Sequence, residues 1–142
     1  MNTNIDYAAL TLRIGLGLMF LAHGLLKVLV FTLPGTVAFF EQAGFPGWTA
    51  YFVAYGEIAA GVLLLAGIAV RGVSIVMLPV LLGALLVHLG NGWVFSSPNG
   101  GWEYPAFLAL ASVVQILLGP GRFVVPLPQR SRDQRSGAQA LN

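Results

Sequence analysis

The chain has 142 residues, of which 57% are hydrophobic and only 8% are charged, and its formal net charge is +2. Soluble domains carry about a quarter charged residues, so this composition excludes a globular protein whose surface faces water. The chain lacks cysteine, which excludes disulfides, thiolate metal sites and cysteine-ligated iron–sulfur clusters within it. The sequence therefore predicts a small integral membrane protein of one domain, in which any redox role needs a bound cofactor, a quinone or a partner subunit.

Four apolar segments follow one another along the chain, each close to the roughly 20 residues that a bilayer-crossing helix needs. They cover residues 7–31, 48–70, 72–93 and 104–118. Because unpaired backbone amides cannot face lipid, each segment is expected to form a continuous helix. The predicted fold is all-α, a bundle of four transmembrane helices that forms one domain over residues 1–123.

The sequence between and after these segments predicts a short helix, a tight joint and a C-terminal tail. Thr36 is expected to cap a short helix over residues 37–43, which would lie at the membrane interface between the first two spans. Arg71 and Gly72 are expected to form a tight joint between the second and third spans. The residues after Pro128 are poor in apolar side chains, and we expect a disordered basic cytoplasmic tail over residues 124–142.

The distribution of basic residues predicts the orientation in the membrane. With four spans, six of the seven basic residues fall on one side, and only Lys27 falls on the other; the six are Arg13, Arg71, Arg122, Arg130, Arg132 and Arg135. Lysine and arginine are enriched on the cytoplasmic side, so we expect a multi-pass protein of the cell inner membrane with cytoplasmic N- and C-termini. The basic tail suits an anionic lipid leaflet, and no broad basic surface points to nucleic acid as a partner.

Polar residues of the spans are expected to gather in the outer half of the bundle. The alternating span directions and the rise of about 1.5 Å per residue place six candidates at similar depth: His23, Lys27, Glu57, His88, Asn91 and Glu103. An acid inside a membrane span is a site hypothesis by default, because an unpaired carboxylate is costly there. We expect Glu57 to form an ion pair with Lys27. The two histidines would then be free to form hydrogen bonds with a ligand.

Each candidate also has a structural interpretation. Lys27 could extend its amine to the lipid headgroups, and His23 could be a core histidine bonded to a backbone carbonyl. Arg13 is expected to anchor the first span at the cytoplasmic edge, while Arg71 marks the joint and the orientation. These interpretations stay open beside the proposal of a site.

Three blocks of the sequence resemble the DoxX family of membrane proteins: "RIGLGLMFLAHGLLKV", "EIAAGVLLLAGIAVR" and "HLGNGWVFSSPNGGWEYPAFLALASVVQILLGPGR". The resemblance covers about residues 8 to 123. It implies a four-helix membrane fold and a link to quinone-coupled electron transfer, as in a thiosulfate:quinone oxidoreductase, or to complexes that handle oxidative stress. It carries over no catalytic residues.

Three functions are compatible with this pattern. The first is a component of quinone-linked redox chemistry or oxidative-stress defence, with a quinone or quinol flanked by Phe20, Trp93 and Trp102 and with electrons from a redox-enzyme partner subunit. The second is a haem or metal site that uses His23 and His88, with Glu57 as an oxygen ligand. The third is a non-enzymatic assembly subunit or a small-molecule transporter, in which the polar residues join helices. The expected protein partner is a redox-enzyme subunit or a second copy of the chain in a homo-oligomer.

Overall fold

The computed structural model describes residues 3–125 of the chain, and within this range it is helical with no strand. The predicted all-α class is therefore confirmed, while residues 126–142 of the predicted tail lie outside the described part. The helices are α1 (Thr3–Leu25), α2 (Leu33–Gln42), α3 (Thr49–Ala66), α4 (Val70–His88) and α5 (Glu103–Leu118). A π-helical segment, Leu26–Val30, continues α1, and a 3₁₀ turn, Leu89–Asn91, continues α4.

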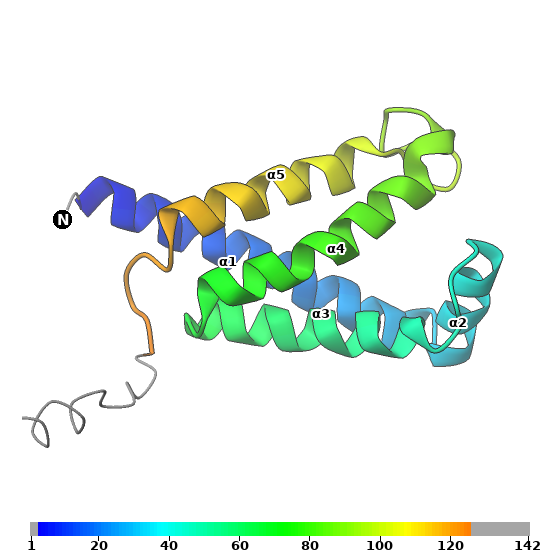
Figure 1. Ribbon diagram of the computed structural model, residues 1–142, viewed down its shortest axis with the longest axis horizontal. Helices are drawn as coiled ribbons and strands as arrows, with labels where there is room; N and C mark the ends of the chain where they lie inside the picture. The colour runs from blue at the N-terminus through cyan, green and yellow to red at the C-terminus, as the bar shows by residue number, and fades with distance from the viewer. Residues whose placement is uncertain (1–2, 126–142) are drawn as a thin grey trace, which may run out of the picture.

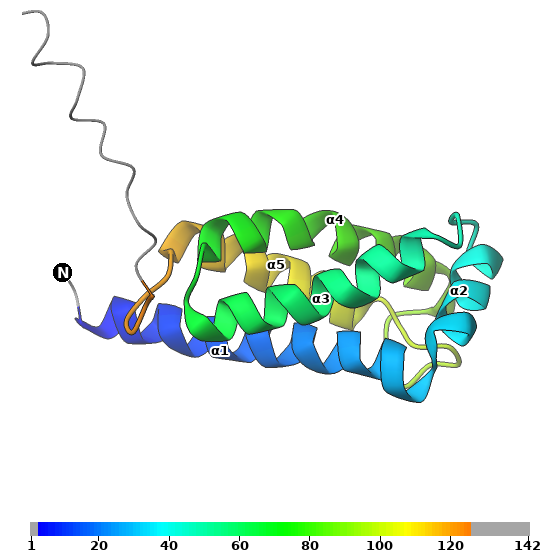
Figure 2. The ribbon, with the colours of Figure 1, turned by 90° about the horizontal axis from the view of Figure 1, so that it is seen from below.

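The helices form two antiparallel pairs, α1 with α3 and α4 with α5 (Figure 1). The two pairs diverge toward the end of the molecule that carries α2 and the loop after α4, which we call the α2 end (Figure 1). Residues 3 and 125 lie at the opposite end, which we call the terminal end (Figure 2). The short helix predicted between the first two spans is present as α2.

Three helical stretches within residues 3–125 are long and apolar enough to cross a membrane: Thr3–Val30, Thr49–Ala66 and Val70–Asn91. Helix α5 is also apolar but has only 16 residues. At about 1.5 Å per residue it is about 24 Å long, against a hydrocarbon core of about 30 Å. By length and composition, the described part of the chain therefore has three membrane-spanning helices and a fourth, shorter apolar helix.

Glycines bring α1 and α3 into close contact. A Cβ atom added at Gly24 would lie 2.7 Å from the carbonyl oxygen of Ala54, and one added at Gly61 would lie 2.6 Å from the backbone nitrogen of Leu21. Helices in lipid lack a hydrophobic drive to associate and use small residues to let backbones approach. This glycine contact holds the candidate site's face of α1 against α3.

An apolar layer crosses the middle of the molecule. The core consists of Leu16, Phe20, Ala60, Leu64, Val70, Val73, Met77, Leu81, Leu108 and Ala111. Six of these side chains, Leu16, Phe20, Met77, Leu81, Leu108 and Ala111, lie along their helices between polar residues near the α2 end and polar residues near the terminal end. The latter are Arg13, Ser74, Ser112 and Gln115. Phe20 is 3% exposed and packs in this core.

The joint between α3 and α4 lies earlier in the chain than predicted. Helix α3 ends at Ala66, Gly67 adopts a left-handed conformation with φ of 73°, and α4 begins at Val70. Arg71 and Gly72 therefore lie in the first turn of α4. Glycine reaches positive φ without a Cβ clash and therefore often follows the last residue of a helix. Gly67 is thus a better indicator of the end of α3 than the predicted joint at Arg71 and Gly72.

Candidate functional site

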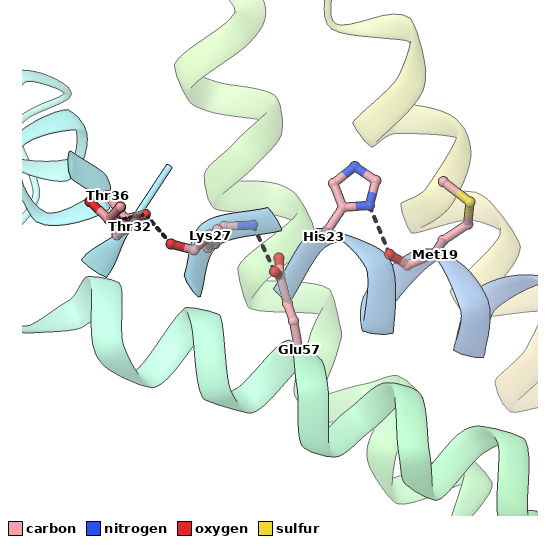
Figure 3. A network of polar contacts seen from close by, with 6 residues as sticks. All are labelled: Met19, His23, Lys27, Thr32, Thr36 and Glu57. Carbon is pink, nitrogen blue, oxygen red and sulfur yellow. Dashed lines mark hydrogen bonds and ion pairs between the residues drawn. The ribbon is translucent and has the colours of Figure 1, made fainter. Parts of the chain in front are cut away.

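An ion pair between α3 and the end of the first span forms the centre of the candidate site. The Nζ atom of Lys27 lies 2.6 Å from Oε2 of Glu57, and the two side chains are 18% and 9% exposed. Figure 3 shows both side chains directed at each other. The pairing predicted from their depths is confirmed. Lys27 therefore does not extend to the headgroups.

A change of helix type positions Lys27. The residue belongs to the π-helical segment Leu26–Val30, in which backbone hydrogen bonds span five residues instead of four, as from Phe31 to Leu26, and this changes the direction of the side chains. Such segments occur often at functional sites. The chain leaves this segment and reverses at Thr32, a β-branched residue with φ of 61°, an unfavourable conformation that the surrounding contacts must maintain.

Thr36 secures this segment from α2. Its hydroxyl lies 2.9 Å from the carbonyl oxygens of both Lys27 and Thr32, and the residue is 4% exposed. The prediction that Thr36 caps the helix is wrong, because α2 begins at Leu33 and the Thr32 side chain accepts the capping hydrogen bond from the backbone of Gly35. The Thr36 hydroxyl instead donates to a backbone carbonyl of this segment or of the residue that follows it.

Replacing Thr36 with valine is expected to lower the free energy of unfolding by about 1 kcal/mol, since it removes a buried hydrogen bond and keeps the shape. Unfolding by sodium dodecyl sulfate in mixed micelles measures the change. Thr11 is the matched control: it is exposed and bonds only to the Tyr7 carbonyl of its own helix. An equal loss for Thr11→Val would contradict the special role of Thr36.

His23 presents one ring nitrogen to the candidate site. Its Nδ1 atom lies 2.7 Å from the carbonyl oxygen of Met19, so Nδ1 carries the proton and donates (Figure 3). In the neutral ring Nε2 is then an acceptor, and no other described residue bonds to it. His23 also lies close enough to Glu57 for the two to interact electrostatically. The interpretation as a carbonyl-bonded core histidine therefore accounts for only one of its two nitrogens.

Tyr104 joins His23 to the far side of the site. The two rings are stacked, with centroids 5.6 Å apart and planes at 24°. The Tyr104 hydroxyl is buried and has no hydrogen-bond partner among the described residues, which is costly unless a water or a ligand supplies one. Tyr104 is absent from the predicted site. Tyr104 lies four residues before Leu108 and eight before Ser112, and both of these are buried on α5. Residues at this spacing share one face of a helix, so the sequence could have indicated that Tyr104 faces inward.

An open, apolar groove of about 480 Å³ lies beside Tyr104 at the α2 end. This volume is within the range of about 300–1,000 Å³ that is usual for small-molecule sites. Of the tryptophans expected to flank a ring, Trp93 lines the groove, whereas Trp102 packs edge-on against Trp93 with centroids 4.4 Å apart. The lining residues are Trp93, Phe95, Glu103, Tyr104, Ala106, Phe107 and Leu110.

Asn91 and His88 support the loop that ends at this groove. The Asn91 amide donates to the carbonyl oxygens of Asn99 and Gly100, at 3.1 and 3.0 Å. His88 donates from Nδ1 to the carbonyl of Ala84 at 2.7 Å, and its ring borders Gly100. The structure thus divides the six predicted residues: the three from the first two spans form one cluster, and the other three surround this loop.

Two arginines act at the terminal end. Arg13 is 2% exposed and donates to the carbonyl oxygens of Pro120 and Phe123, at 2.7 and 3.1 Å. Its predicted role as an anchor at the membrane edge is therefore wrong, because its guanidinium is buried against the segment after α5. Arg71 donates from Nε to the carbonyl of Ile116 at 3.1 Å. Both arginines hold the end of α5 against the rest of the molecule.

Comparisons with known proteins identify the family of this chain. The DoxX family model matches residues 8–89, more than half of the chain. A protein of Bacillus subtilis (strain 168) named "Putative oxidoreductase CatD" is 32% identical over 138 residues, which cover 96% of this chain and 97% of that protein. No solved structure matches the chain significantly. The family match and the full-length relative together show that this chain belongs to the DoxX family.

Proposed function

We propose that this chain is the membrane component of a quinone-linked redox system and binds a quinone or quinol in the outer half of a four-span bundle. One observation carries the proposal. A buried Lys27–Glu57 pair adjoins a histidine with an unused Nε2, and that histidine stacks on a tyrosine that lines an aromatic groove. The groove offers a ring-sized site, and the neighbouring side chains offer proton carriers.

The proposed topology has α5 as the fourth span. Helix α5 runs beside α4 from the α2 end to the terminal end (Figure 2), and a short helix can cross where the bilayer thins locally. Of the basic residues in the described part, Arg13, Arg71 and Arg122 lie toward the terminal end, whereas Lys27 lies toward the α2 end. This asymmetry supports cytoplasmic termini in the cell inner membrane, with α2 at the outer interface.

The chemistry of quinones supports the same site. Quinone reduction and quinol oxidation move protons as well as electrons, and His23 and Glu57 are side chains that can exchange protons. Without cysteine the chain cannot hold a cysteine-ligated iron–sulfur cluster, so we propose that a partner redox enzyme supplies or accepts the electrons. The name of the Bacillus subtilis relative, an oxidoreductase, supports a redox role.

Gently purified protein is expected to retain quinone or quinol that mass spectrometry can detect, and His23→Ala is expected to retain about tenfold less, as loss of one hydrogen bond predicts. Thr11→Ala is the control, because the Thr11 side chain also bonds to a carbonyl of α1 but is exposed and lies outside the cluster and the groove. Wild-type protein without quinone, or equal retention by His23→Ala, would overturn the proposal.

Haem binding is a second candidate, favoured by one observation. Both histidines donate Nδ1–H to a backbone carbonyl and leave Nε2 without a protein partner in the described part of the chain. Metal-ligating histidines use this arrangement, because the bonded nitrogen fixes the orientation of the ring. An absorption spectrum of the same preparation separates the two candidates: a Soret band supports haem.

A further inference from the structure

The groove beside Tyr104 offers a ligand hydrogen-bond acceptors. Its one charged side chain is Glu103, whose Oε1 atom accepts a hydrogen bond from the backbone nitrogen of Phe95 at 2.8 Å. No described residue bonds to the other carboxylate oxygen, Oε2. An ionised carboxylate can only accept hydrogen bonds, so Oε2 is available to a ligand that donates one.

The walls of the groove select a flat, apolar ligand. Trp93, Phe95 and Phe107 line it with aromatic rings, and aromatic side chains pack favourably against another ring. Phe107 is 66% exposed and Phe95 is 68% exposed, so the groove opens at the surface of the molecule. On the proposed topology this surface faces the lipid, and a lipid-soluble ring can enter sideways from the bilayer.

We propose that this groove binds a quinol, the reduced and hydroxyl-bearing form, in preference to the corresponding quinone; the inference rests on the proposed quinone-linked function. A quinol hydroxyl donates to Glu103 Oε2 in a charge-assisted hydrogen bond, which is stronger than a neutral one. A quinone carbonyl has no proton to donate and would place its lone pairs against those of the carboxylate. Sites built to bond a hydroxyl reject analogues that lack it.

Of the two neighbouring polar side chains, His23 also favours binding of the quinol, and Tyr104 does not distinguish the quinol from the quinone. His23 Nε2 is an acceptor in the neutral ring, since Nδ1 carries the proton that bonds to Met19. The Tyr104 hydroxyl both donates and accepts, so it can bond to either form of the ligand. The selection for the reduced form therefore lies with Glu103.

Calorimetric titration of the protein in lipid nanodiscs tests this, with a short-chain ubiquinol kept reduced under argon and the matching ubiquinone as probes. Wild-type protein is expected to bind the quinol at least about tenfold more tightly. In Glu103→Gln the amide oxygen still accepts from Phe95, but an NH₂ donor replaces Oε2, so the preference is expected to reverse. Glu41→Gln, an exposed acid on α2 outside the groove, is expected to keep the wild-type preference.

The outcomes separate the two proposals. Equal or tighter binding of the quinone by wild-type protein overturns the inference and leaves the proposed function in place, and so does an unchanged preference in Glu103→Gln. Binding of neither probe overturns the proposed function as well. If Glu103→Gln fails to fold, the ratio of the two wild-type affinities still decides.

Discussion

Replacement of Lys27 with methionine is expected to lower the free energy of unfolding by about 3–5 kcal/mol, because it leaves the Glu57 carboxylate buried without its partner. The two side chains are 18% and 9% exposed, so water can replace little of the lost interaction. Denaturation by sodium dodecyl sulfate in mixed micelles, followed by circular dichroism, measures the loss.

A double variant is the control for this prediction. Lys27→Met with Glu57→Leu removes both charges together, and its stability is expected to return close to the wild-type value, since buried pairs replaced by apolar residues are often neutral. A double variant as unstable as Lys27→Met alone would contradict the account. If the double variant folds but retains no quinone, the pair serves the proposed site; if it folds and retains quinone, the pair only joins helices.

Gly61→Ala is expected to lower the free energy of unfolding by on the order of 2–3 kcal/mol, despite the better helix propensity of alanine. The new Cβ would lie 2.6 Å from the backbone nitrogen of Leu21 and 2.8 Å from the carbonyl oxygen of Gly17. Backbone atoms cannot turn away as a flexible side chain can, so α1 and α3 must separate. The same micelle titration measures the effect.

Gly56→Ala on the same helix is the matched control. A Cβ there meets nothing within 4 Å, so only the propensity term acts, and the variant is expected to gain up to about 1 kcal/mol. Opposite signs for the two substitutions identify close helix contact as the cause. A loss of similar size at both positions would instead indicate that α3 tolerates no change in backbone flexibility.

The sequence predicts those features that depend on composition and on position along a span. The apolar segments and the pairing of Lys27 with Glu57 follow from depth alone, because both residues had to find a partner in the same layer. The contact between His23 and Tyr104 could not be derived this way, since it depends on how α5 crosses α1. No pattern of apolar residues specifies that crossing.

Arg13 shows a second limit. A long side chain near a helix end can reach the membrane edge or a distant backbone carbonyl, and spacing within one helix does not distinguish the two. Its actual partners, Pro120 and Phe123, lie more than a hundred residues away in the chain. The π-helical turn at Lys27 is likewise not predictable from spacing within one helix, and its Lys27 carbonyl accepts a hydrogen bond from Thr36 in the next helix.

The apolar layer of the core has a bioenergetic consequence. Leu16 and Phe20 on α1, Met77 and Leu81 on α4, and Leu108 on α5 separate the Lys27–Glu57 cluster from the buried polar residues near the termini. A proton cannot hop through a stretch of hydrocarbon side chains. On the proposed topology, protons released or taken up at the proposed site would therefore exchange with the outer compartment.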